Sequence, residues 1–256
     1  MGTADSPPAA PGPARPESGA GLPPTIRLYL DDAYLATAEA EVVAVDVETG
    51  RVAVDRTVFY PTGGGQPHDL GFFGNSAVTA VRSEGEVVWH TLEGELPRVG
   101  ETVELAIDWE RRHRLMRTHT ALHILCGVIW NDYRTAVTGG NMEPLSARMD
   151  FEFDPLPEGF GAAVEQRVNE EVAADRPVAV SYLDAGAAAV DPDLIRTKAN
   201  LVPEYVTRVR IVDIVGLDKQ ADGGTHVRST AEVGPVRVVK TESKGKGNKR
   251  IRIALD

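Results

Sequence analysis

The sequence has 256 residues, of which 42% are hydrophobic and 25% are charged, and its net charge is −11. Such a composition is typical of a globular protein in water, and no apolar run approaches the roughly 18 to 20 residues of a membrane-spanning helix. The start of the chain has no apolar segment behind a basic one, so we expect no secretory signal. Cys126 is the single cysteine, which excludes an intrachain disulfide and favours a reducing cytoplasm.

The acidic balance argues at first against a nucleic-acid partner, because like charges repel. The basic residues are segregated, however: residues 236–256 contain seven lysines and arginines against two acidic residues, and four arginines stand between positions 111 and 117. Such strips can hold the end of an RNA, although solvated surface charge is an alternative that the sequence leaves open. The candidate RNA-binding residues are Arg114, Lys244, Lys246, Lys249 and Arg250.

The first 24 residues contain seven of the 17 prolines and almost nothing large and apolar, so we predict a disordered tail over residues 1–24. From residue 25 to 109, short apolar segments separated by turns predict the strands of a small barrel or sandwich. They cover residues 26–30, 40–47, 51–55, 77–81, 87–90 and 103–107. Three consecutive glycines at residues 63–65 indicate a backbone that bends sharply or approaches something closely, or else a plain flexible turn.

The apolar period changes near residue 109. Residues 110–130 contain no proline and no glycine before Gly127, and they carry leucine and isoleucine on a helical stripe, which predicts a helix. A second helix is predicted over residues 158–174, and strands are predicted at residues 178–182, 206–213, 236–240 and 250–254, the last two as a hairpin. The second part, residues 110–256, is therefore expected to be α+β.

Two residue pairs have the spacing of metal ligands. His119 and His123 are four residues apart on the predicted helix, so both imidazoles project from one face. Asp222 and His226 have the same spacing in a glycine-bearing loop after a strand. Imidazole nitrogen and carboxylate oxygen both bind Zn²⁺. Either pair alone is also consistent with a partly buried surface, but together they predict a four-ligand site.

Longer matches surround these pairs. Residues 118–125 (THTALHIL) and 220–227 (QADGGTHV) closely resemble the paired metal motifs of the alanyl-tRNA editing family. That family is similar to the editing domain of alanyl-tRNA synthetase and, more distantly, of threonyl-tRNA synthetase. Further matches follow in the expected order at residues 59–66, 146–151, 232–235 and 245–251. The resemblance implies an α+β fold with a small N-terminal β-barrel domain, residues 25–109, followed by an α+β editing domain with a metal site, residues 110–256.

The resemblance also implies a function. Members of this family hydrolyse the ester of mischarged tRNA, removing serine or glycine from alanine tRNA, with one zinc ion as cofactor and the acceptor end of aminoacyl-tRNA as partner. By their position in the family motifs, Gln66 and Thr225 are the expected catalytic residues. Gly64, Gly65 and Gln220 are expected to bind the substrate.

One residue departs from the family pattern, and it is a ligand. Asp222 stands where the family usually has a cysteine. Carboxylate oxygen is a harder ligand than thiolate, so another divalent metal such as iron, manganese or cobalt becomes an alternative to zinc. Cys126 lies three residues after His123 on the predicted helix and is a second candidate for the missing thiolate, although a buried cysteine commonly acts as a small apolar filler.

The altered ligand leaves other functions open. The chain is expected to be a deacylase for alanine tRNA, and a specialised deacylase for threonyl-tRNA or halogenated-threonyl-tRNA is an alternative. A metal-dependent hydrolase of small molecules and a non-catalytic tRNA-binding module are further alternatives. Salt-dependent tRNA binding distinguishes the expected deacylase from a small-molecule hydrolase. Metal content distinguishes it from a non-catalytic tRNA-binding module.

Overall fold

The computed structural model describes residues 21–153, 155–184, 186, 188, 194, 208–245 and 247–256. Residues 1–20 of the predicted tail and Lys246 lie outside the described residues. The described end of that tail is packed, because Leu22 lies against an apolar cluster formed by Ala53, Val87 and Trp89.

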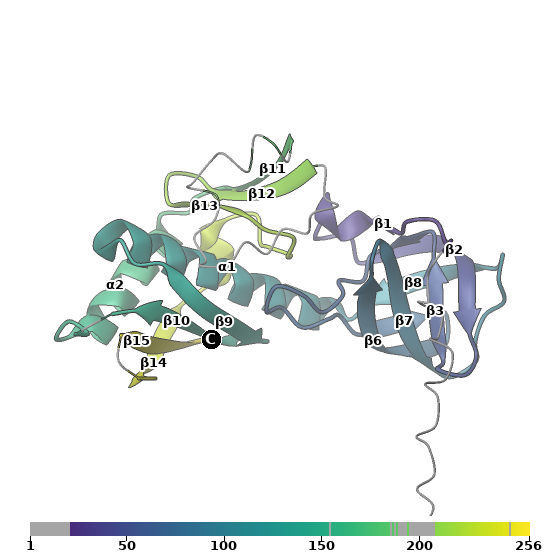
Figure 1. Cartoon of the computed structure of the whole chain (residues 1–256), viewed down its shortest axis with the longest axis horizontal. Helices are drawn as coiled ribbons and strands as arrows, with labels where there is room; N and C mark the ends of the chain where they lie inside the picture. Colours follow the sequence, from purple (N-terminus) through teal and green to yellow (C-terminus); the bar gives the residue numbers. More distant parts are fainter. Residues whose placement is uncertain are drawn as a thin grey trace, which may run out of the picture.

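Six antiparallel strands close into a barrel in the order β2-β3-β7-β6-β5-β8 (Figure 1). The interior holds mainly valine, leucine and phenylalanine side chains, as the alternating apolar pattern requires. The strands are β2 Thr37–Asp46, β3 Arg51–Val54, β5 Gly71–Phe73, β6 Ser76–Glu84, β7 Val87–Glu93 and β8 Thr102–Ile107. A parallel pair, β1 Ile26–Arg27 and β4 Arg56–Thr57, lies beside them.

The predicted strand at residues 26–30 is wrong in its second half, where Leu28–Leu30 form the 3-10 turn η1. Tyr29 in this turn is buried against Tyr60, with ring centroids 5.3 Å apart, so its burial comes from a turn and not from strand alternation. The strands β4 and β5 were not predicted, because segments of two or three residues are too short to show an alternating apolar pattern.

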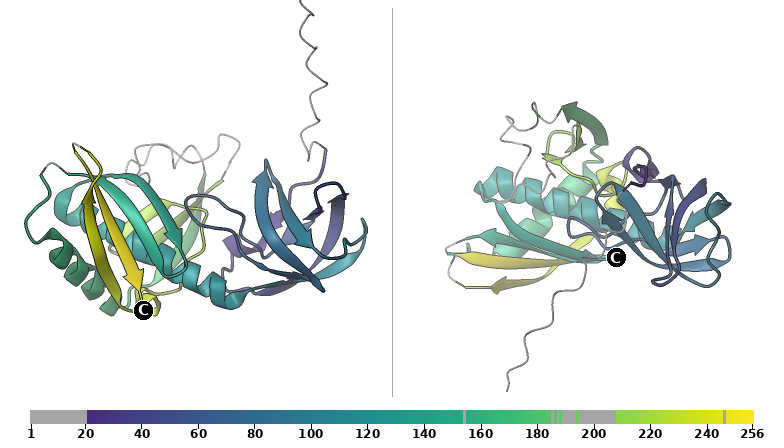
Figure 2. Two further views of the ribbon diagram at one scale, coloured as in Figure 1. Left: turned by 90° about the horizontal axis from the view of Figure 1, so that it is seen from below. Right: turned by 45° about the vertical axis from the view of Figure 1, so that its right-hand side comes forward.

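The long helix α1, Trp109–Tyr133, connects the barrel to the rest of the chain (Figures 1 and 2). It begins at Asp108, whose carboxylate accepts a hydrogen bond from the Arg111 backbone N–H at 3.0 Å, the usual N-cap contact. It ends at Arg134, which adopts a left-handed conformation. The predicted helix at residues 110–130 is confirmed, and Trp109 at its start packs against both large apolar clusters of the molecule.

Two sheets and a second helix surround α1. One sheet has the order β14-β15-β10-β9 and the other has the order β11-β12-β13. The strands are β9 Val137–Glu143, β10 Ser146–Glu152, β11 Val178–Asp184, β12 Arg208–Ile214, β13 Asp218–Ala221, β14 Val236–Ser243 and β15 Asn248–Leu255. The helix α2, Phe160–Ala173, confirms the second predicted helix, and a 3-10 turn η3 spans Thr230–Val233.

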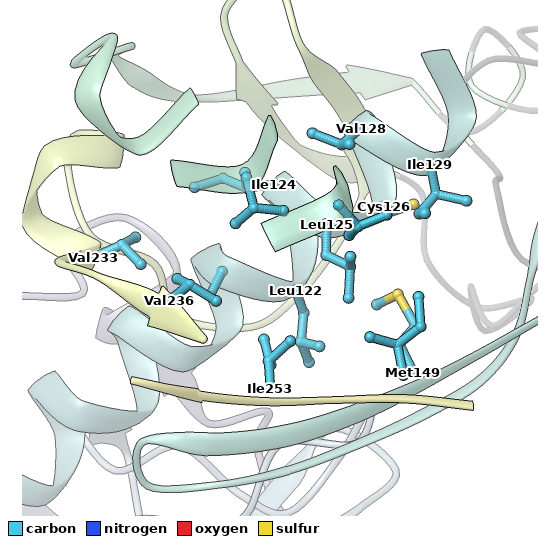
Figure 3. Packing of buried hydrophobic residues seen from close by; sticks show 14 of the residues in the cluster. Leu122, Ile124, Leu125, Cys126, Val128, Ile129, Met149, Val233, Val236 and Ile253 are labelled. Carbon is cyan, nitrogen blue, oxygen red and sulfur yellow. The ribbon is translucent and has the colours of Figure 1, made fainter. Parts of the chain in front are cut away.

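The apolar core of this part forms around the buried middle of α1, where leucine, isoleucine and valine contact residues from β10, β14 and β15 (Figure 3). The α+β class is therefore confirmed, and so is the predicted hairpin, since β14 pairs with β15. β9 was not predicted because Gly139 and Gly140 interrupt its apolar pattern. Within the described part of the chain, no helix has both the length and the apolar character needed to cross a membrane.

Candidate metal centre

Four side chains from two distant segments meet at one point. His119 and His123 come from one face of α1, and Asp222 and His226 come from the loop that follows β13. One ligand atom from each of the four lies within 4.8 Å of all the others. The three histidines are 4% to 6% exposed, and the Asp222 carboxylate is 17% exposed. The cluster is thus enclosed by protein on most sides.

The rings of His119 and His226 direct their Nε2 atoms toward the Asp222 carboxylate. His226 Nε2 lies 3.0 Å from Asp222 Oδ2, and His119 Nε2 lies 3.7 Å from Asp222 Oδ1. The His119 and His226 rings are stacked with centroids 4.3 Å apart, and the His123 ring stands edge-on to His226 at 4.7 Å. The three rings and the Asp222 carboxylate thus pack against one another around the four candidate ligand atoms.

Each histidine is also held through its other ring nitrogen. His119 Nδ1 lies 3.0 Å from Gln66 Oε1, and His123 Nδ1 lies 3.0 Å from Asp218 Oδ2. Both partners are acceptors, so Nδ1 carries the proton and the Nε2 lone pair is left for a metal. His226 Nδ1 lies 3.3 Å from the Thr120 hydroxyl. Such outer partners fix the tautomer and orientation of histidine ligands.

The electrostatics of the cluster also suit a cation. Burial lowers the pKa of His119 well below its usual value and lowers the pKa of His226 to about 4. Burial alone would raise the pKa of Asp222, but the facing His119 and His226 rings hold that pKa well below its usual value. Neutral imidazoles at His119 and His226 beside an ionised carboxylate are the protonation states that metal binding requires. The third ring differs, because burial alone would lower the pKa of His123, but Asp218 outweighs that effect and raises this pKa. Three nitrogens and one carboxylate oxygen therefore fit a four-coordinate zinc ion.

Cys126 does not join this group. Among the described residues, the cluster of potential ligand atoms contains Asp222 and not Cys126. The thiol is buried in the apolar core beside Leu125 and Ile129 (Figure 3), and its Sγ accepts a hydrogen bond from Gln220 Nε2 at 3.3 Å. The geometry agrees with a cysteine that fills space in the core.

Two glycines allow the backbone to approach α1 closely. A Cβ placed on Gly224 would lie 2.3 Å from His119 Cε1 and 2.9 Å from Gln66 Oε1. A Cβ placed on Gly127 would lie 3.0 Å from the Asp218 Cβ. Both positions therefore need glycine for space, since carbon atoms normally stay about 3.5 Å or more apart.

The two predicted catalytic residues lie together next to His119. Gln66 is 1% exposed and Thr225 is fully buried. Gln66 Nε2 donates to Thr225 Oγ1 at 2.9 Å, and Gln66 Oε1 accepts from the Thr225 backbone N–H at 3.1 Å as well as facing His119. The Gln66 side-chain amide therefore orients both the His119 ring and the loop that contains Thr225.

The three predicted substrate-binding residues separate into two places. Gly64 and Gly65 lie in the loop of Gln66, where both adopt positive φ, and the Gly65 carbonyl accepts from the Met142 backbone N–H of β9 at 3.3 Å. Gln220 lies on β13, where its Nε2 donates to Asp218 Oδ2 at 2.7 Å. It therefore supports the outer partner of His123.

Several of the predicted RNA-binding residues are paired within the protein. Arg114 pairs with Glu110 one turn earlier on α1, and Arg250 makes a two-point contact with Asp150 at 2.7 and 2.8 Å. Lys249 Nζ donates to Ser243 Oγ at 3.2 Å, and Lys244 is exposed.

The arginine cluster at positions 111–117 is not a continuous basic strip. Arg112 is completely buried, and Arg117 donates to the backbone carbonyls of Val233 and Asp256. The sequence shows charge but not burial, and for Arg112 the interpretation as a surface residue is wrong.

Sequence reasoning missed two residues that shape the site. Asp218 was not singled out, although a carboxylate at the start of a strand four residues before Asp222 is a detectable signal. Arg210 of β12 is 7% exposed, and its Nη1 donates to the carbonyls of Asp222 and Gly224 at 3.0 Å each. Its Nε donates to the Leu30 carbonyl at 2.9 Å, so Arg210 ties the ligand loop to the turn η1.

Comparison with known proteins shows the family of the chain. A family profile described as the threonyl and alanyl tRNA synthetase second additional domain matches residues 209–252, and one described as class II (A) tRNA synthetases matches residues 32–111. The "Alanyl-tRNA editing protein AlaX-M" of Saccharolobus solfataricus is 38% identical over 89% of this chain and 97% of its own length. The protein of the same name from Methanosarcina barkeri is 34% identical over 90% and 99%.

A longer relative contains the same region. The "Alanine--tRNA ligase" of Pyrobaculum neutrophilum is 35% identical over 87% of this chain, which corresponds to 26% of the ligase. The stand-alone editing proteins, by contrast, are matched over nearly their whole length. The chain therefore belongs to the alanyl-tRNA editing protein family.

Proposed function

We propose that this protein is a trans-acting, metal-dependent deacylase that hydrolyses the ester of mischarged tRNA, with serine or glycine on alanine tRNA as the substrate. The observation that carries the proposal is the enclosed group of three histidines and one aspartate in a chain that spans nearly the full length of stand-alone editing proteins. We also propose that residues 25–109 form a barrel domain and residues 110–256 form the editing domain.

His119, His123, Asp222 and His226 would hold the metal. When bound, a zinc ion supplies Lewis-acid chemistry, either by lowering the pKa of a water to about 7 or by orienting the substrate. The carboxylate of Asp222 makes iron, manganese or cobalt an alternative to zinc. Arg210 keeps the Asp222 loop in place through two backbone carbonyls, so the carboxylate stays on the histidines.

Other residues of the chain position the ester. Gln66 fixes the ring of His119 and the backbone of Thr225. Gly64 and Gly65 expose backbone in the same loop, where amides can contact the terminal adenosine or the oxyanion that develops during hydrolysis. Gln220 supports His123 through Asp218. Hydrolysis of an activated ester needs such positioning more than it needs a strong acid.

The acceptor end of tRNA would be held by surface cations. Of the candidates Arg114, Lys244, Lys246, Lys249 and Arg250, Lys244 is exposed, while Arg114 and Arg250 pair with acidic neighbours. Each cation that contacts a phosphate contributes roughly 0.7 to 0.9 to the slope of log affinity against log salt concentration. A Lys244→Ala variant therefore tests this part of the proposal by its salt slope. A location in the reducing cytoplasm remains part of the proposal.

The decisive experiment gives the purified protein, loaded with zinc, four substrates: alanine tRNA charged with serine, glycine or alanine, and threonine tRNA charged with threonine. We expect release of serine and glycine and slow release of alanine. For serine against alanine, a site built to bond the serine hydroxyl can reject the analogue that lacks it by roughly 10⁴-fold. Inertness toward all four, with metal bound, would contradict the proposal.

Asp222 favours a second candidate. Because it departs from the usual cysteine of the family at a ligand, a deacylase specialised for threonyl-tRNA or halogenated-threonyl-tRNA is the alternative. Preferential release of threonine in the same assay, or of a halogenated threonine when threonine tRNA charged with it is added as a fifth substrate, would replace the first candidate with the second.

A further inference from the structure

The loop that carries Gln66 is closed at its base. The Tyr60 backbone N–H donates to Asp69 Oδ2 at 2.6 Å, and the Asp69 backbone N–H donates to the Tyr60 carbonyl at 3.1 Å. At the tip, Gly63 and Gln66 exchange backbone hydrogen bonds of 3.2 and 2.8 Å. The loop from Tyr60 to Asp69 is therefore compact, and the Asp69 carboxylate holds its two ends together.

Arg112 of α1 holds that carboxylate. The side chains of Arg112 and Asp69 are both 0% exposed. Arg112 Nε donates to Asp69 Oδ1 at 3.0 Å, Nη2 donates to Asp69 Oδ2 and to the Val58 carbonyl, and Nη1 donates to the Ala33 carbonyl at 3.0 Å. The fork of the guanidinium thus fixes both the position and the orientation of the carboxylate.

Stability alone is a weak reason for such a pair. Replacing a buried ion pair by apolar side chains of similar volume is often neutral or stabilising, because burial removes both charges from water. Val58, whose carbonyl accepts from Arg112, belongs to the apolar core of the barrel, so apolar side chains at these positions would have an apolar neighbour. We therefore ask which part of the site the Arg112–Asp69 pair holds in position.

The pair and the metal ligand share one helix. Arg112 precedes His119 by seven residues, which is about two turns and about 10 Å along the same face of α1. From Asp69 the loop returns to Gln66, whose Oε1 lies 3.0 Å from His119 Nδ1. Helix, ion pair, loop and amide form a closed ring of contacts that begins and ends on α1.

We propose that the Arg112–Asp69 pair is a positioning pair, which sets Gln66 against His119 and so fixes the ring nitrogen that carries the proton. Its effect on metal binding is transmitted through Gln66 and through no other route. The inference rests on the metal centre of the proposed function, and it concerns the free protein without tRNA. A merely structural tether between barrel and helix would leave the His119 tautomer unchanged.

The test replaces the pair by apolar residues, Arg112→Met with Asp69→Leu, and measures two properties. The first is the Nδ1–H signal of His119 in ¹⁵N-histidine NMR spectra of the metal-free protein, which we expect to be lost in the variant. The second is zinc affinity by competition with a chelator, which we expect to fall roughly 10- to 100-fold, the usual effect of losing the partner of a histidine ligand.

The route through Gln66 is tested by combination. Gln66→Ala alone should weaken zinc binding by a similar factor, and adding the pair replacement to Gln66→Ala should cause little further loss, because coupled residues are not additive. Arg51→Met is the matched control, since Arg51 pairs with Asp46 and Glu84 on the barrel surface and should leave both measurements unchanged. The proposal would be overturned if the losses of zinc affinity multiplied in the combined variant, or if the His119 Nδ1–H signal were unchanged in the pair replacement.

The outcomes remain separable from those of the proposed function. If the native protein binds no zinc, the metal centre fails while the NMR signal still tests the pair. If the double replacement does not fold, Arg112→Lys is used in its place. Lysine keeps a positive charge beside Asp69 but lacks the guanidinium group that bonds both carboxylate oxygens. In that variant the His119 Nδ1–H signal should exchange faster with water than in the native protein, and an unchanged exchange rate would overturn the proposal.

Discussion

Gly224 gives the sharpest test of how the ligand loop packs on α1. In Gly224→Ala the new Cβ would lie 2.3 Å from His119 Cε1 and 2.4 Å from Nδ1. The backbone of Gly224 cannot yield easily, because its N–H donates to Asp222 Oδ2 at 2.6 Å and its carbonyl accepts from Arg210 at 3.0 Å. The substitution therefore acts on the imidazole.

The size of the effect follows from the geometry. Carbon atoms in contact lie about 3.5 to 4.0 Å apart, so the His119 ring must move by about 1 Å. Metal–ligand distances tolerate only about 0.2 Å. We therefore expect zinc affinity to fall more than roughly 100-fold, beyond the usual loss for an outer partner, and the metal-free protein to lose about 1 to 3 kcal/mol of unfolding free energy from overpacking.

The assay is zinc competition with a chromogenic chelator, combined with urea unfolding of the metal-free protein. Gly223→Ala is the matched control, because a Cβ on the neighbouring glycine meets nothing within 4 Å. It should bind zinc like the native protein. Native zinc affinity in Gly224→Ala would refute the argument that the loop and His119 are packed as described.

Three further predictions follow from the same structure. Gly127→Ala should push Asp218 away from His123 and weaken zinc binding roughly 10-fold or more, measured by the same competition, even though alanine favours the helix by about 1 kcal/mol. Asp222→Cys should retain zinc while Asp222→Ala loses it, measured as metal content after dialysis; equal retention would remove Asp222 from the ligands. Burial lowers the pKa of His90 to about 4, so the unfolded chain takes up this proton first and stability falls as the pH drops from about 6.5 to 4. The stability advantage over His90→Gln should shrink by about 3 kcal/mol across that range in urea titrations, and a constant difference would contradict the burial of a neutral imidazole.

The ligands could be predicted because their spacing is local. His119 and His123 stand one helical turn apart, and the helix period shows this in any window of the sequence. The spacing of Asp218 from Asp222 is also local, but nothing local assigns Asp218 to His123, which is 95 positions away in the chain. Only the fold, with Gly127 allowing close approach, brings the two together.

Charge was the least informative part of the sequence. Arg112 and Arg114 are two positions apart and read alike, yet one is fully buried on Asp69 and the other lies on the surface beside Glu110. Short or glycine-containing strands were also invisible, as in β9, because a period needs several residues to be detected. Burial is a property of the whole fold, and a single sequence does not display it.

The loop tip of Gln66 has a consequence for folding kinetics. Its amide bonds to Thr225, a residue 159 positions away, and contacts of such long range are costly in loop entropy and generally form late. The metal ligands, which come from α1 and from the loop that contains Thr225, are then not assembled during most of the folding pathway. Bound zinc should therefore slow the unfolding of the native protein far more than it speeds folding, as expected for interactions missing from the transition state.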